Sequence, residues 1–242
     1  RFILYIVIAT FVLLNAAFAQ NDSPGVGFKS TGQSSMNFLE VSVVPKAVSL
    51  GDAYTSAGKG IESIFYNPAG LAESANKTEF FFSITNWIAD IDYVAAAASW
   101  NWTNVGTFGL SFINVDYGDI IGTRLISASN IANHELGYED IGLISNVGAY
   151  AFGLAYARAV TDVFLFGGGV RFVGQQLGQS LLSNGMTDNN MLKVAFDLGV
   201  KYYTPLRGFR FAMSIRNFAN SVKYEEVSSS LPLNFAVGGA ID

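Results

Sequence analysis

The side chains with the clearest potential for metal binding or catalysis lie in one stretch, NHELGYED. It holds His134, the one histidine of the chain, with Glu135, Glu139 and Asp140 close by. An imidazole and three carboxylates could bind a cation, but neither a second histidine nor any cysteine is present to complete a typical site. The favoured interpretation is a solvated acidic loop.

Two glycine-rich stretches resemble phosphate-binding loops only in part. Gly167, Gly168 and Gly169 lie within a strand pattern, and no helix pattern follows to present its N-terminus to a phosphate. In GDAYTSAGKG, Gly60 follows Lys59 at the position where a P-loop requires Ser or Thr to bind magnesium. The sequence therefore predicts no enzymatic site, no metal and no cofactor.

The most informative motif is IFYNPAGLA, residues 64–72. Asn67 precedes Pro68, so its backbone is driven toward an extended conformation, and its side-chain amide can bind nearby backbone. Ala69 follows, and Gly70 then lets the chain reverse. On these residues alone, the motif is a buried turn that precedes the first strand.

The elements that must position this motif are strands. About eight are expected, most of them near the roughly 9 to 11 residues of a tilted membrane strand, at residues 78–88, 93–102, 107–116, 148–158, 163–176, 192–203, 209–219 and 232–241. Short links at 103–106, 160–162 and 204–208 contrast with long loops expected at 117–147, 178–191 and 220–231, the short link at 89–92 being the exception. Such alternation is typical of an outer-membrane barrel.

The strand patterns have one apolar and one small or charged face. In KVAFDLGVKYY, residues 193–203, the bulky apolar parity holds Val194, Phe196, Leu198, Val200 and Tyr202. We expect that parity to face lipid and the other to face the lumen. The lumen-facing charges would then be Arg171, Lys193, Asp197, Lys201, Arg210 and Arg216, with Arg210 and Arg216 as possible partners of Asp197.

Composition supports a surface that water does not fully cover. Hydrophobic residues make up 50% of the chain and charged residues 14%, against about 25% charged in ordinary soluble domains. No internal apolar run approaches the roughly 18 to 20 residues of a membrane-spanning helix. A soluble β-sandwich stays as the alternative, although its outer face would be rich in Lys and Glu. The net charge of -5 gives no case for nucleic acid.

Four regions are expected along the chain. Residues 1–19, a basic start followed by FILYIVIATFVLL and small residues, form a signal peptide, with a membrane anchor as the alternative. Residues 20–37 are a flexible leader, and 38–77 a compact segment with a short helix near 46–54. Residues 78–242 form the barrel. Because eight strands leave no room inside for that segment, and the chain starts without Met and ends at GGAID, we expect a longer natural protein.

The block FLEVSVVPKAVSLGDAYTSAGKGIESIFYNPAGLA resembles the PorV/PorQ family of outer-membrane barrels, relatives of the FadL-type fatty-acid transporters. The later stretches YARAVTDVFLFGGGVRF, AFDLGVKYYTPLRGFRFAMSIRNFAN and LPLNFAVGGAID are similar to that family too. The resemblance implies an all-β transmembrane antiparallel barrel of about fourteen strands with an N-terminal plug. Asn67, Pro68, Ala69 and Gly70 would anchor that plug. Many relatives carry an Ala-Arg-rich run and paired acidic residues before the motif, where this chain has PKA and GKGIE.

Two functions follow from the resemblance. The first is a non-enzymatic barrel of the bacterial outer membrane that holds or shuttles secreted or surface proteins in type IX secretion. Its partners would be outer-membrane lipid, together with secreted cargo proteins or other secretion-system subunits bound through the outer loops. The alternative is a FadL-type transporter of long-chain fatty acids or other hydrophobic compounds, which requires an apolar pocket inside the barrel.

Overall fold

The computed structural model describes residues 34–125, 137–144, 147–182, 185–206, 208–224 and 227–241. The chain divides into two units, Arg1–Thr31 and Gly32–Asp242, and every described residue belongs to the second. The expected signal peptide and most of the leader lie outside the described residues, as do His134 and Glu135. Within the described ranges, no helix has the length and apolarity needed to cross a membrane.

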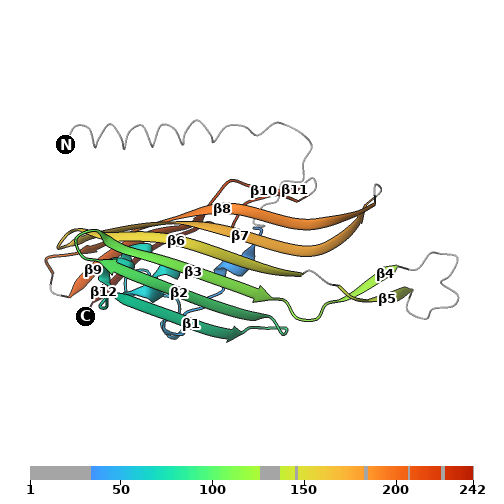
Figure 1. Cartoon of the computed structure of the whole chain (residues 1–242), viewed down its shortest axis with the longest axis horizontal. Coiled ribbons are helices and arrows are strands. Elements are labelled where there is room, and N and C mark those ends of the chain that lie inside the picture. The colour runs from blue at the N-terminus through green and yellow to red at the C-terminus, as the bar shows by residue number, and fades with distance from the viewer. Residues whose placement is uncertain are drawn as a thin grey trace. The chain divides into compact units, whose positions relative to one another are not determined.

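The core of the fold is an antiparallel sheet of eight strands in the order β1-β2-β3-β6-β7-β8-β9-β12 (Figure 1). The strands are β1 (Thr78–Asn86), β2 (Asp92–Trp102), β3 (Gly106–Asp116), β6 (Val147–Thr161), β7 (Phe164–Leu182), β8 (Gly185–Tyr203), β9 (Phe209–Phe218) and β12 (Asn234–Ile241). Each corresponds to one of the eight predicted strands, so the all-β antiparallel prediction is confirmed. The sheet is open, because among the described residues β1 pairs only with β2 and β12 only with β9.

The short links are as expected, but the three long loops are not. Residues 117–147 contain a separate hairpin of β4 (Ile121–Leu125) and β5 (Tyr138–Leu143), and 220–231 contain β10 (Val222–Tyr224) and β11 (Val227–Ser229). Residues 178–191 belong mostly to β7 and β8. The two strands stay paired through Ser180 with Thr187 and as far as Leu182 with Gly185. The loop prediction was wrong here because backbone pairing continues where the apolar alternation stops, and pairing itself needs no apolar face.

The residues before the sheet form a packed segment, which we call the N-terminal segment and define as residues 34–75. It contains short helices: η1 (Asn37–Glu40), α2 (Pro45–Ser49), η2 (Ile61–Phe65) and η3 (Pro68–Glu73). The helix expected near 46–54 is therefore present but shorter, ending where Gly51 adopts a φ of 61°. Met36 is buried, so the described end of the expected leader packs with the segment.

The N-terminal segment covers one face of the sheet, which we call the packed face. Its apolar side chains, among them Phe38, Val44 and Leu71, share one cluster with Ala95 and Val115 of the sheet. Small side chains predominate on the packed face because the short helices lie close to it (Figure 1). The segment and the sheet therefore form a single hydrophobic core.

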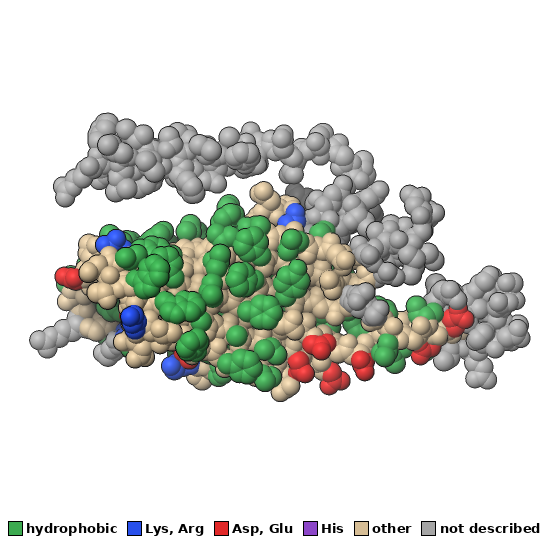
Figure 2. Space-filling model, viewed as in Figure 1, with side chains coloured by type: hydrophobic (Ala, Val, Ile, Leu, Met, Phe, Trp, Pro, Cys, Tyr) green, Lys and Arg blue, Asp and Glu red, His purple; other side chains and the backbone are tan. Residues whose placement is uncertain are grey.

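The opposite face, the exposed face, carries the bulky apolar side chains. Along β8, Ala195, Asp197, Gly199 and Lys201 are buried, whereas Val194, Phe196, Leu198 and Tyr202 are exposed. Neighbouring strands repeat this pattern with Phe80, Phe82, Phe108, Phe112, Phe152, Leu154 and Phe166. Figure 2 shows apolar side chains spread over the face of the sheet that this view presents. The predicted alternation of faces is thus confirmed.

Candidate functional site: attachment of the N-terminal segment

Asn67 joins the N-terminal segment to two strands of the sheet. It caps η3, because its Oδ1 accepts a hydrogen bond from Ala69 N at 3.1 Å. Its Nδ2 donates to the carbonyls of Val200 on β8 at 3.2 Å and Met213 on β9 at 3.5 Å, and to Thr55 O at 3.0 Å. Only 1% of the residue is exposed. A buried turn with these partners is an attachment point.

Two glycines of the sheet make room for this contact. A Cβ at Gly199 of β8 would overlap Asn67 Oδ1, and a Cβ at Gly167 of β7 would overlap the Pro68–Ala69 peptide. Gly70 completes the motif, since its N–H donates to Asn67 O and its carbonyl accepts from Gly60 N, both at 3.0 Å. Asn67, Pro68 and Ala69 therefore lie against the packed face, whereas the contacts of Gly70 are within the N-terminal segment. Sequence reasoning missed that Gly167 and Gly199 lie opposite the motif.

Lys201 is the second link between the sheet and the N-terminal segment. Its Nζ donates to Gly58 O at 2.6 Å and forms an ion pair with the Glu73 carboxylate at the end of η3. Glu73 also accepts a hydrogen bond from Tyr203. Since Lys201 is 0% exposed, this pairing is what makes its burial tolerable. Glu73 was not predicted, although it is only the third residue after the NPAG motif.

Asp197 binds a partner other than the two predicted. Its carboxylate lies 2.6 Å from Arg171 Nη2 and also accepts from Asn217 N at 2.8 Å, while Arg171 Nη1 donates to Asn217 Oδ1 at 2.9 Å. The register explains this outcome, because Arg171 pairs with Ala195 and so lies diagonally beside Asp197 on the same face. Arg210 is opposite Tyr203, six positions along β8 from Asp197.

The remaining predicted charges divide between segment and sheet. Arg210 Nε donates to Ser56 O at 2.9 Å, and Arg216 donates to Phe65 O while its guanidinium lies 5.2 Å from the centroid of the Tyr66 ring. Lys193 has the same parity on β8 as Asp197 and Lys201. It is partly exposed, because it lies farther from the Tyr203 end of the strand. Two arginines of β9 thus bind carbonyl groups of the N-terminal segment.

Glu79 on β1 is another attachment that sequence reasoning missed. Its carboxylate accepts from Ile61 N at 2.9 Å, Ala75 N at 3.0 Å and Asn76 N at 3.3 Å. The available signal was parity, because Glu79 shares the face of Phe81 and the buried Ser83 and so points to the segment. β1, β8 and β9 therefore each contribute polar groups that satisfy segment backbone.

Two buried tyrosines brace the segment internally. Tyr66 donates to Asp52 Oδ1 at 2.8 Å and shares a hydrogen bond with Ser42, and Tyr54 donates to Glu62 at 2.6 Å. Burial raises the pKa of Tyr66 to about 12, and the Asp52 hydrogen bond also raises it. Burial likewise raises the pKa of Tyr54. Both phenols stay protonated donors at neutral pH.

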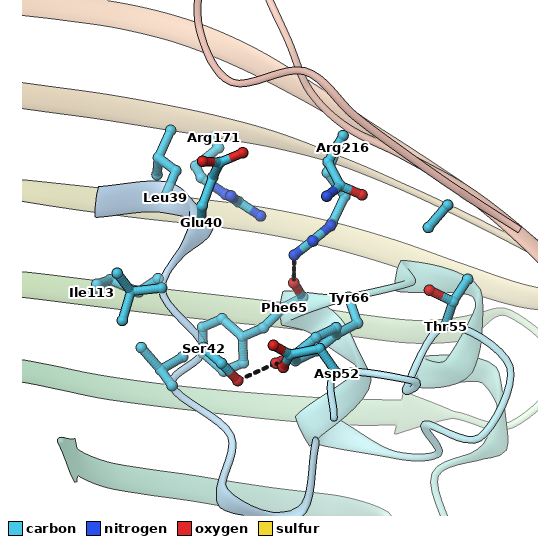
Figure 3. Close-up of a pocket in the computed structure, with 14 residues that line it drawn as sticks. Leu39, Glu40, Ser42, Asp52, Thr55, Phe65, Tyr66, Ile113, Arg171 and Arg216 are labelled. Atoms are coloured by element: carbon cyan, nitrogen blue, oxygen red, sulfur yellow. Dashed lines mark hydrogen bonds between the residues drawn. The ribbon is translucent and has the colours of Figure 1, made fainter. Parts of the chain in front are cut away.

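A polar cavity of about 170 Å³ lies between the segment and the sheet (Figure 3). Arg171 and Arg216 enter it from the strands, and Ser42, Asp52 and Tyr66 line it from the segment. In the described part of the chain, no three His, Cys, Asp or Glu side chains gather as metal ligands do. Each titratable group named at this interface has a structural partner, so the arrangement holds two pieces of chain together.

The sequence matches no family model and no curated protein.

Proposed function

We propose that this chain is part of an outer-membrane β-barrel of the PorV/PorQ type, with the N-terminal segment as its plug. The observation that carries the proposal is the distribution of side chains between the two faces. Charged groups such as Arg171, Asp197 and Lys201 are buried under the segment, whereas bulky apolar groups are exposed. A sheet in water has the reverse need, because its exposed face must be charged.

Lipid is the solvent that suits the exposed face. Phe80 at its edge is 76% exposed, and each of the long strands contributes further apolar side chains. An aromatic cluster near the short turns, in which Trp102 contacts Phe108 and Phe108 contacts Tyr156, has the composition of an interfacial girdle. A continuous apolar surface of this kind is unusual on a soluble monomer.

Closure into a barrel would remove the two open edges of the sheet. The outer edges of β1 and β12 present unpaired backbone groups that a hydrocarbon environment does not tolerate. Further strands of a longer protein would pair with both edges, and the family resemblance implies about fourteen strands in the whole barrel. The exposed residues of the segment, such as Val48 and Leu50, would then face the missing wall.

A plug attached in this way suits a barrel that holds proteins rather than one that conducts. Asn67 and Lys201 attach the segment to β8 near one edge of the sheet, and Glu79 attaches it to β1 at the other edge. Hairpins at the opposite end from the short turns offer surfaces for protein contact. We therefore assign the chain to type IX secretion, where it holds or shuttles secreted or surface proteins.

The test is a comparison of exported proteins from the source bacterium with and without the full-length gene, by mass spectrometry. When the gene is deleted, we expect secreted proteins with a C-terminal sorting domain to be missing from the cell surface and to accumulate in the periplasm. Complementation with the wild-type gene is the control. An unchanged set of surface proteins would overturn the proposal.

One observation favours FadL-type transport as the second candidate. A cavity of about 480 Å³ opens near the turn between β1 and β2, and apolar side chains such as Met36, Phe38, Trp87 and Ile88 line much of it. A pocket of this size and lining suits a hydrophobic solute. Uptake of a labelled long-chain fatty acid by cells with and without the gene distinguishes this function from secretion, which predicts equal uptake.

A further inference from the structure

The hairpin of β4 and β5 forms a two-stranded sheet of its own beside the eight-stranded one (Figure 1). We call residues 119–125 and 137–144 the acidic hairpin. At its base, Ile144 N donates to Ile120 O at 2.8 Å, and Ile144 packs against Gly178 of β7. Beyond this base, a two-stranded hairpin in water has little stability of its own. Contact with another surface would supply what it lacks.

The acidic hairpin exposes large apolar side chains. Ile121 and Leu143 are register partners at the start of the hairpin, and they are 61% and 64% exposed. Tyr138 and Ile141 are exposed as well. The register places Ile121, Leu143 and Tyr138 on one face of the hairpin, whereas Ile141 lies on the other face, beside Gly122. The exposed groups of the first face form a small patch of the kind that marks an interaction surface.

Carboxylates surround this patch. Asp119 and Asp140 are exposed on the hairpin, where Arg124 is the register partner of Glu139. The adjoining end of the sheet adds Asp90, Asp92 and Asp116, of which Asp92 and Asp116 lie directly opposite each other. Figure 2 shows acidic side chains gathered over this end of the sheet and along the hairpin. Like charges placed opposite each other are unfavourable unless something neutralises them.

These charges limit which surface can cover the patch. Lipid is disfavoured, because carboxylates resist transfer into the bilayer and are repelled by anionic headgroups. A second copy of the chain is disfavoured too, because a symmetric contact would set acidic residues against the same acidic residues. A partner with the opposite charge satisfies both the apolar and the acidic groups.

We propose that the acidic hairpin docks an exported protein that presents an apolar groove rimmed by lysines and arginines. The inference rests on the proposed function, which places this end of the barrel outside the membrane. Ile121 and Leu143 would enter the groove, while Asp119 and Asp140 pair with the basic rim. Rim charges of this kind mainly speed and select the encounter, and the buried apolar groups hold the complex.

Site-specific photo-crosslinking in cells that express the full-length protein tests this inference. A benzophenone amino acid at Ile121 probes the hairpin, and the same probe at Leu198 on the exposed face is the control. We expect Ile121 to give crosslinks to exported proteins, identified by mass spectrometry, whose contact peptides include Lys or Arg. Leu198 should give none. Crosslinks from Ile121 only to lipid, only to a second copy, or to nothing would overturn the proposal.

Charge variants supply the second measurement. Asp119→Lys combined with Asp140→Asn reverses the charge and keeps an acceptor for Gly142 N, which Asp140 Oδ1 binds at 2.7 Å. We expect the crosslink yield to fall by about tenfold or more. Asp162→Lys, in the turn at the other end of the sheet, should leave it unchanged. Equal yields in all variants would contradict the charged rim.

The two proposals can fail separately. If gene deletion leaves surface proteins unchanged while the crosslinks persist and depend on charge, secretion fails as the function and the docking surface stands. If deletion blocks export but the Ile121 probe captures no exported protein, the secretion assignment stands and the docking surface is wrong.

Discussion

Lys201 of β8 forms its ion pair with Glu73 of η3, so a fully buried ammonium group of the sheet is neutralised by the N-terminal segment. Gly58 O and Tyr203 complete the polar environment of this pair. The sheet and the segment therefore depend on each other, because either charge left alone in this site would be unfavourable.

The Lys201→Met variant should destabilise the attachment by about 3–5 kcal/mol, because it leaves the Glu73 carboxylate buried without a cation. Protease cleavage within the segment of the purified full-length protein measures this loss. The double variant Lys201→Met with Glu73→Gln should recover much of it, and Lys193→Met at the partly exposed position should behave as wild type. Cleavage of the single variant at the wild-type rate would show that the Lys201–Glu73 ion pair does not hold the segment in place.

Asn67→Ala should weaken the same attachment by about 1–3 kcal/mol, since it leaves the Val200 and Met213 carbonyls without their donor. Asn67→Asp should be worse, because it directs a carboxylate at those carbonyl oxygens. Asn76→Ala, at an exposed site, is the matched control. Hydrogen exchange of residues 60–75 reports the change, and equal protection in Asn67→Ala and wild type would sink the prediction.

Gly199→Ala should displace the motif, because the added methyl overlaps Asn67 Oδ1. We expect a loss of about 1–3 kcal/mol. Gly168→Ala adds a methyl whose nearest neighbour is the flexible end of Leu198 at 3.3 Å, so it should be nearly neutral. Combining Gly199→Ala with Asn67→Gly should cost less than the sum of the two single variants. Strict additivity in denaturant unfolding would show that the two positions do not touch.

High pH should loosen the segment. The pKa of Tyr66 is about 12 in the folded protein and 10.0 in an unfolded chain, so the fold holds the phenolic proton more tightly. Its stabilising contribution is complete below pH 10 and is lost as the pH rises from 10 through 12. The midpoint temperature of thermal unfolding, measured at pH values from 9 to 12 in steps of about one pH unit, checks this. Tyr66→Phe should lessen the dependence without abolishing it, because Tyr54, whose pKa burial also raises, remains. An unchanged slope in that variant would contradict the prediction.

Leu198→Arg should impair membrane insertion if the exposed face meets lipid, by about 2–4 kcal/mol for a charge near the bilayer centre. Leu198→Ala keeps the site apolar and is the control. Folding into phospholipid vesicles, read by the heat-dependent gel mobility of the full-length protein, measures insertion. If the arginine variant inserts as well as the alanine variant, the exposed face does not contact hydrocarbon.

Much of the fold could be predicted from alternation alone. The parity of Phe196 and Asp197 gave the correct exposed and packed sides, because side-chain direction in a strand has a period of two whatever solvent covers it. The end of β7 after residue 176 and the start of β8 before Leu192 were missed. Pairing there is made by the backbone and leaves little trace in side-chain type.

The candidate site was harder to predict because its contacts are between residues far apart in sequence. The NPAG residues could be selected from their turn chemistry, but nothing local to them indicates Gly199 or Lys201 as their neighbours. The partner of Asp197 depended on tertiary contacts: Arg171 lies diagonally beside it on β7, whereas the Arg216 side chain, at an irregularity of β9 across from Asp197, donates to Phe65 O of the segment. Tertiary register is the information that a strand pattern lacks.

The distance along the chain between Asn67 and its acceptors has a kinetic consequence. Val200 and Met213 follow it by 133 and 146 positions, and a ribosome releases the N-terminal end first. The segment must therefore wait, with its apolar side chains uncovered, until β8 and β9 exist and have paired. Contacts of such long range form slowly. If the chain is exported as proposed, a chaperone that binds this stretch early would protect it from aggregation until the sheet can receive it.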